Sequence, residues 1–214
     1  MLNGILQTDL FYCDHIGASP NDEQDISNFT VHDSRGMNLK NYIQNVAFSD
    51  EASRQMRTYL VRDNFSSELV GYFSLKSGLI SYNERDVLVI DEITGEEIID
   101  KITGKNKMRR TFDTMPGIEL ANFAVNQSYI SMHPDLKGTG LVIFNNFILP
   151  IVKQASDLVG TALIYIFALP YEELISRYEQ YGFLRLETSL ETQLHSRLKP
   201  YYDEHCIFMF QPIM

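Results

Sequence analysis

The C-terminal half of the chain switches repeatedly between the two-residue period of strands and the longer period of helices, and this order most constrains the fold. Apolar, aromatic and β-branched residues predict strands at 118–125, 162–169, 183–187 and 206–211, and helices at 139–159 and 171–181. Pro150 lies inside the longer helix, where its missing amide donor and its ring predict a kink. Such alternation predicts a mixed α/β sheet flanked by helices.

The N-terminal part adds weaker signals. We expect a strand at 5–12, a turn-rich loop at 17–28, helices at 37–48 and 51–56, and a hairpin of strands at 57–62 and 68–75. The heavily charged stretch 84–116 indicates a surface insertion, with helical or mobile parts, that covers a site or decorates the fold. No internal repeat is visible. A chain of 214 residues, 44% of them hydrophobic, suits a single domain over 1–214 with its core at 57–211.

A glycine-bearing loop, His133-Pro-Asp-Leu-Lys-Gly-Thr-Gly-Leu-Val142, runs directly into the longer helix. Gly138 and Gly140 permit tight turns, and the free amides of a first helical turn attract anions. No Lys-Ser/Thr pair follows the glycines, so this is not a Walker loop. Taken alone, a short Gly-x-Gly is a weak signal, and an ordinary turn at a helix start explains it more often than a pyrophosphate site does.

Three segments in this order, Ile118–Val125, the glycine loop and Ala168–Phe183, resemble the GNAT superfamily of acetyltransferases. The resemblance covers about residues 57–211. It implies a mixed, mostly antiparallel central sheet that is splayed between two central strands. It also implies acetyl-CoA as co-substrate, with no metal.

The same resemblance implies the residues that bind acetyl-CoA. The backbone of Phe123, Ala124 and Val125 corresponds to the strand that pairs with the pantetheine arm. The pyrophosphate loop corresponds to Lys137, Gly138, Thr139, Gly140, Leu141 and Val142. Lys137 stands where the family usually has Arg or Gln, and Val142 where it has Gly or Ala. Tyr171 replaces the asparagine with which the family often contacts CoA, so that contact does not carry over.

Tyr178 is the predicted general acid. It begins Tyr-Glu-Gln-Tyr-Gly-Phe183, which resembles the family's Tyr-Glu-x-x-Gly-Phe pattern, whose tyrosine protonates the departing thiolate. A phenol of ordinary pKa stays protonated at neutral pH and can donate to sulfur as the thioester breaks. On spacing alone, a tyrosine packed on an amphipathic helix beside Leu174 and Ile175 explains the position better than a catalytic role does.

Glu119 is the predicted base, because the attacking amine must lose a proton before it can attack. Regular alternation along the strand places Glu119 on the same face as Phe123 and Val125, where burial would make its carboxylate a stronger base. The alternative is a solvated residue at the start of a strand.

Composition narrows the choice of partners. The net charge of −10 disfavours nucleic acid and suits a cationic small-molecule or peptide amine. No apolar run is long enough to cross a bilayer, and the start of the chain lacks a signal pattern, so we expect a cytoplasmic protein with no membrane partner. The two cysteines and five histidines form no metal-ligand pattern, and a homodimer stays open.

We therefore expect an N-acetyltransferase that transfers acetyl from acetyl-CoA to a primary amine by direct attack. Two alternatives are kept. One is a toxin that acetylates aminoacyl-tRNA, because Phe123–Val125 and the Ala168–Phe183 segment also resemble that branch of the GNAT superfamily. The other is a non-catalytic CoA-binding or scaffold domain.

Overall fold

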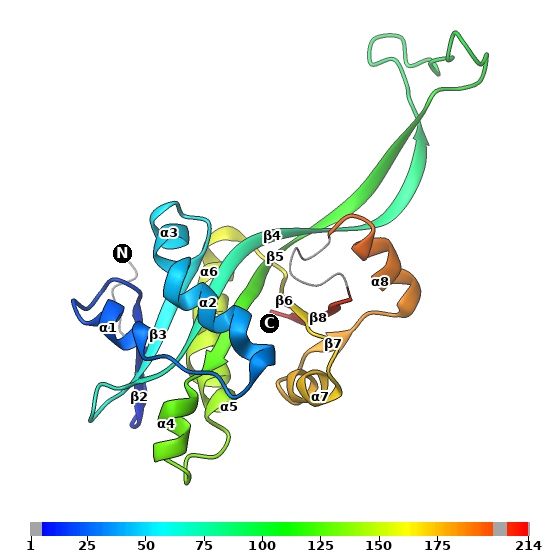
Figure 1. The fold of residues 1–214 in the computed structure, drawn as a ribbon. Coiled ribbons are helices and arrows are strands. Elements are labelled where there is room, and N and C mark those ends of the chain that lie inside the picture. Colours follow the sequence, from blue (N-terminus) through cyan, green and yellow to red (C-terminus); the bar gives the residue numbers. More distant parts are fainter. Residues whose placement is uncertain (1–5, 199–204, 214) are drawn as a thin grey trace.

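A computed structural model describes residues 6–198 and 205–213, and the strands within them form one sheet (Figure 1). The eight strands lie in the order β1-β2-β3-β4-β5-β6-β8-β7. Only β5 and β6 run parallel. The predicted fold class, a mixed and mostly antiparallel sheet flanked by helices, is confirmed. The strands are β1 Leu6–Gln7, β2 Phe11–His15, β3 Arg57–Asp63, β4 Leu69–Leu88, β5 Met108–Val125, β6 Leu163–Ala168, β7 Leu184–Arg185 and β8 Ile207–Pro212.

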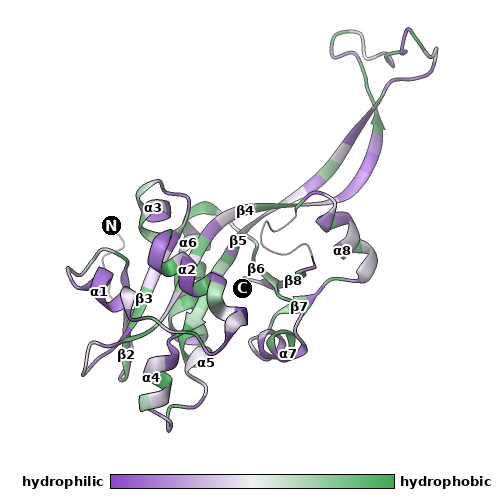
Figure 2. Ribbon diagram, viewed as in Figure 1, coloured by the Kyte–Doolittle hydropathy of each residue, from purple (hydrophilic) through white to green (hydrophobic). Residues whose placement is uncertain are grey.

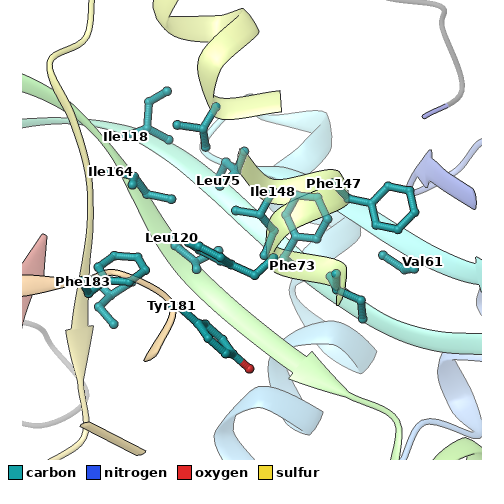
Figure 3. Close-up of a cluster of buried hydrophobic side chains, with 14 of the residues drawn as sticks. Val61, Phe73, Leu75, Ile118, Leu120, Phe147, Ile148, Ile164, Tyr181 and Phe183 are labelled. Carbon is teal, nitrogen blue, oxygen red and sulfur yellow. The ribbon is translucent and has the colours of Figure 1, made fainter. Parts of the chain in front are cut away.

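Helices cover both faces of the sheet. Side chains alternate along a strand, so Val61 and Phe73 pack against the α5–α6 segment, whereas Leu60 and Tyr72 pack against α1, α2 and α3. Figure 3 shows the first of these clusters, in which Phe147 and Ile148 lie over Phe73 and Leu75. The helices are α1 Asp22–Ser27, α2 Met37–Asn45, α3 Ala47–Ala52, α4 Gln127–Met132, α5 Thr139–Ile143, α6 Leu149–Val159, α7 Glu172–Gln180 and α8 Thr188–His195.

The segment 139–159 is helical throughout, as predicted, but it changes type before its proline. α5 is followed by a π-helical stretch, Phe144–Ile148, and Pro150 lies at the start of α6. The amide of Leu149 donates to the carbonyl of Phe144, five residues back. This wider turn accommodates a residue that cannot donate to the carbonyl four residues before it.

The charged insertion forms a long β-arm, so the prediction of helical parts is wrong. β4 and β5 stay paired from Gly71↔Val125 at the body to Leu88↔Met108 near the tip. The arm projects far beyond the rest of the molecule (Figure 1). Its stem is mostly hydrophilic in Figure 2, because both faces of a two-stranded ribbon meet water.

Several predicted element bounds are wrong. The expected strand at 5–12 is divided between β1 and β2, and Ile5 lies outside the described residues. The expected helix at 51–56 instead occupies Ala47–Ala52, and the strand at 183–187 is reduced to the two residues of β7. The sequence analysis also missed α4 and α8, and the stretch 17–28, expected to be a loop, contains the helix α1.

Candidate active site

Strands β5 and β6 separate partway along the sheet. Their parallel pairing runs from Gly117↔Leu163 to Glu119↔Tyr165 and then stops. Beyond Glu119, β5 stays paired only with β4, and β6 only with β8. The backbone of β5 from Leu120 onward therefore has no strand partner on its β6 side, which matches the predicted splay.

A β-bulge lies at the point of separation. Ser74 faces Asn122 and the next residue, Leu75, faces Leu120, so Ala121 is an extra residue in β5. A bulge reverses the alternation of side chains and bends the strand. Unbroken alternation predicts that Glu119 and Phe123 lie on the same face, but the bulge places them on opposite faces. Phe123 packs against the buried cluster under α5–α6.

A cavity of about 930 Å³ occupies the space that the splay opens. Both predicted catalytic residues, Tyr178 and Glu119, line this cavity. Phe123 is the one predicted cofactor residue in its wall. The remaining lining comes mainly from α2, from Leu120–Asn122 of β5 and from Ile166–Leu169 at the end of β6. The cavity therefore gathers residues from parts of the chain that are far apart in sequence.

Tyr178 is held on α7 by other aromatic rings. Its ring meets Tyr181 and Phe183 edge to face, at centroid distances of 5.9 and 5.6 Å. Burial raises the pKa of Tyr178, and the neighbouring Tyr181 adds to the rise. The phenol is therefore protonated at neutral pH and can serve as a proton donor but not as a base.

Glu119 is oriented by two partners. The hydroxyl of Tyr165 donates a hydrogen bond of 3.3 Å to its Oε2, and Lys76 Nζ lies 3.6 Å from the same oxygen. Burial, and then the Glu119 carboxylate, raise the pKa of Tyr165, which keeps that hydroxyl a donor. The opposed glycines Gly78 and Gly117 make room for the ring, because a β carbon on Gly78 would collide with the Tyr165 hydroxyl.

The predicted pyrophosphate loop lies beside the end of β5. Gly138 has a φ of +77° and forms the N-cap of α5; the Leu141 amide already donates to its carbonyl at 2.9 Å, so the amides of Thr139 and Gly140 are the ones that the helix start leaves for an anion. The Thr139 hydroxyl donates to the Leu136 carbonyl at 2.8 Å and closes the loop. A β carbon on Gly140 would lie 2.7 Å from the Tyr181 hydroxyl oxygen and 3.8 Å from Phe123. Glycine at this position thus lets the loop approach α7 and β5.

The other predicted cofactor positions are arranged along these two elements. Ala124 and Val125 pair with Tyr72 and Gly71 of β4 through one backbone edge. Lys137 is exposed, whereas Leu141 and Val142 begin the helix that covers the core. None of these residues is in the cavity wall.

The sequence analysis missed the polar wall that α2 supplies. Asn38, Asn41 and Asn45 line the cavity together with Tyr42. Their spacing of three and four residues places them on one face of a helix. That spacing is visible in the sequence and could have indicated a polar, ligand-facing side.

Arg35 joins the α2 side of the cavity to α7. Its Nη1 lies 3.3 Å from Glu173 Oε2, and its guanidinium carbon lies 5.2 Å from the centre of the Tyr171 ring. Tyr171, which replaces the family's asparagine, therefore contacts a neighbouring part of the protein.

Two classes of site find no support in the described part of the chain. No cluster of three or more His, Cys, Asp or Glu side chains there could hold a metal ion. Among the same residues, no helix has the length and apolar character to cross a bilayer. Cys13 and Cys206 are both buried, and burial raises the pKa of Cys13 well above its ordinary value, which keeps it an unreactive thiol.

Solved structures similar to this chain share its fold over nearly their whole length. A tyrosine-to-phenylalanine mutant of KacT aligns with a TM-score of 0.61 at 16% identity, over 96% of both chains. AtaTR bound with acetyl-CoA aligns at 0.58 and 15% identity, over 96% of this chain and 95% of the other. AtaT complexed with acetyl-methionyl-tRNAfMet aligns at 0.59 and 16% identity, over 94% of each. The chain has the GNAT fold.

This GNAT fold was expected from the sequence, and at these identities the likeness concerns the fold alone. No protein-family profile matches the chain, and no curated protein matches it either.

Proposed function

We propose that the chain is an acetyl-CoA-dependent N-acyltransferase that acetylates a primary amine by direct attack. The observation that carries the proposal is the cavity between β5 and β6, whose lining includes both Tyr178 and Glu119. The unpaired edge of β5 offers backbone groups to an extended pantetheine arm, and the loop at Gly138–Gly140 offers helical amides to a pyrophosphate.

Each residue has one role in this reaction. Glu119 accepts the proton of the substrate ammonium, directly or through a water, and so leaves a neutral amine with a free electron pair. The amine attacks the thioester carbonyl and the new C–N bond forms; the attacking nitrogen then releases its second proton to water, and the C–S bond breaks to leave the neutral amide. Tyr178 donates its phenolic proton to the departing sulfur, and solvent returns that proton to Tyr178.

Acetyl-CoA is expected to stabilise the purified protein against heat. At 100 times its dissociation constant, a ligand that binds only the folded state adds about 2.7 kcal/mol. For a domain of this size that free energy corresponds to a rise in Tm of roughly 5–11 °C. Differential scanning fluorimetry and calorimetric titration would measure it, with ATP at the same concentration as the control. Equal shifts with ATP and acetyl-CoA, or no shift in folded protein, would contradict the proposal.

Glu119→Gln is expected to lower kcat/KM about 100-fold at neutral pH, since amide nitrogen and oxygen cannot accept the ammonium proton. The deficit should shrink as pH rises toward the pKa of the amine, because solution then supplies neutral amine. Initial rates across a pH series would measure this, with Glu187→Gln, on an exposed residue before α8, as the matched control. A pH profile parallel to that of the unaltered enzyme would remove Glu119 from the base role.

Aminoacyl-tRNA is the second candidate substrate, and the observation that favours it is the comparison with AtaT complexed with acetyl-methionyl-tRNAfMet. Its α-amino group is a primary amine, so the same residues would act on it. The net charge of −10 is the argument against it, although a local contact surface does not require a basic chain overall. Labelled acetyl-CoA offered with charged tRNA and, separately, with polyamines and lysine peptides would distinguish the two substrate classes.

A further inference from the structure

The tip of the β-arm is built from a short tandem repeat, which corrects the view that the sequence contains none. Residues 90–98 and 99–107 both read Ile-Asp-x-Ile-Thr-Gly in their first six positions. In each unit the aspartate, Asp91 or Asp100, accepts hydrogen bonds of 2.8–2.9 Å from the amides two and three residues later. The glycines, Gly95 and Gly104, have φ angles of +72° and +67°. The units therefore form two equivalent turns, which we call lobe 1 (90–97) and lobe 2 (99–106).

A closed ring of three backbone hydrogen bonds holds the lobes to the stem. Val89 donates to Lys107 at 2.9 Å, Lys107 donates to Ile98 at 2.7 Å, and Ile98 donates to Val89 at 2.9 Å. These three residues are nine positions apart, so each lobe begins and ends at equivalent points of the ring. The ring fixes the relative placement of the lobes.

Each lobe exposes an isoleucine at the same place in its turn. Ile93 is 94% exposed and Ile102 is 96% exposed, and Ile90 and Ile99 are also more than half exposed. The turns do not need them, because the aspartate and glycine supply the turn geometry. A group of large apolar side chains that the fold leaves in water indicates a surface for another molecule.

The two lobes carry opposite charges at equivalent positions. Glu92 and Glu96 in lobe 1 correspond to Lys101 and Lys105 in lobe 2. Lobe 1 also has Asp91 and Glu97 and no basic residue. Lobe 1 is therefore complementary in charge to lobe 2, and both present an isoleucine in the middle of the charged positions.

We propose that the arm tip is a docking surface for a second copy of this chain. In a twofold pair, lobe 1 of each protomer meets lobe 2 of its partner, which gives two equivalent contacts. In each contact Ile93 lies against Ile102 of the partner subunit, and Glu–Lys pairs surround the two isoleucines. Such an isologous contact needs a surface that complements itself, which is what two like turns of opposite charge provide. The arm keeps this contact away from the candidate active site (Figure 1).

Charge exchange between the lobes tests the proposal. Variant A carries E92K and E96K, and variant B carries K101E and K105E. In either variant alone, both contacts of the pair bring like charges together, and we expect the dimer dissociation constant to rise at least about tenfold. A mixture of A and B restores opposite charges at both contacts, so its mixed dimer should form about as well as that of the unaltered chain. Sedimentation velocity over a concentration series measures all three.

Two further variants separate the arm from other surfaces. E179K with E187K makes the same charge change on exposed residues of the body and should leave the dimer unaffected. I93S with I102S should weaken the dimer by about the same factor as the charge reversals. Three results would overturn the proposal. The unaltered chain could be monomeric at a concentration on the order of 100 μM. Its dimer could be unaffected by variants A and B and by the serine variant, or the mixture of folded A and B could stay monomeric.

Discussion

Tyr178→Phe is expected to lower kcat about 100- to 1,000-fold while changing the dissociation constant of acetyl-CoA less than about twofold. Phenylalanine keeps the ring that packs on Tyr181 and Phe183, so the cavity and the helix should persist. It removes the one proton that the departing sulfur would receive. The loss should therefore fall on turnover and not on binding, which single-turnover rates and calorimetric titration would separate.

The matched control is Tyr82→Phe, on the arm and outside the cavity wall. Tyr82 is exposed, so removal of its hydroxyl should leave kcat unchanged. Full turnover by the Tyr178→Phe variant would exclude Tyr178 as the acid. If acetyl-CoA bound but no amine or aminoacyl-tRNA were ever acetylated, the non-catalytic scaffold alternative would be favoured.

Arg62→Met is expected to lower the free energy of unfolding by about 3–5 kcal/mol, the usual cost of leaving a buried charge without its partner. Arg62 is 3% exposed, and its Nη2 lies 2.6 Å from Oδ1 of Asp22, which is itself 2% exposed. Its Nη1 lies 2.7 Å from Asp25. Methionine fills a similar volume but provides no donor, so the Asp22 carboxylate would stay in the interior unpaired.

Chemical denaturation of two further variants makes this prediction specific. Arg62→Met with Asp22→Asn should recover part of the lost stability, because asparagine can still accept from the Gly17 amide but carries no charge. Arg85→Met breaks the exposed pair with Asp113 and should cost less than about 1 kcal/mol. Equal losses for Arg62→Met and Arg85→Met would show that burial of the pair does not matter. Since the pair anchors α1 to β3, its loss should also weaken the packing of α1 against α2, the helix that lines the cavity.

Much of the fold could be predicted because its local patterns are strong. The order of strands and helices after residue 118 and the helix start at Gly138 follow from period and from glycine chemistry. The arm was misread because a two-stranded ribbon exposed on both faces has no apolar alternation to reveal it. The short α4 and α8 have too few residues for a helical period to stand out.

The sequence indicated part of the cavity wall but not its arrangement. Tyr178 and Glu119 do line one cavity. The face of Glu119 was wrong because no residue type marks a bulge, so Ala121 reads like any other strand residue. The contacts of Glu119 with Tyr165 and Lys76 arise between strands distant in sequence, and periodicity along one strand cannot reveal them.

The extra residue at Ala121 acts as a phase shift within β5. Before it, the odd-numbered Glu119 faces Tyr165 and Lys76, while after it the odd-numbered Phe123 and Val125 face the helix that follows the glycine loop. One strand can thus hold the polar contacts of Glu119 and the packing against the α5–α6 segment on opposite faces. A substitution on one face of β5 therefore need not disturb the packing on the other face. Deletion of Ala121, in contrast, would exchange the two faces along the rest of the strand.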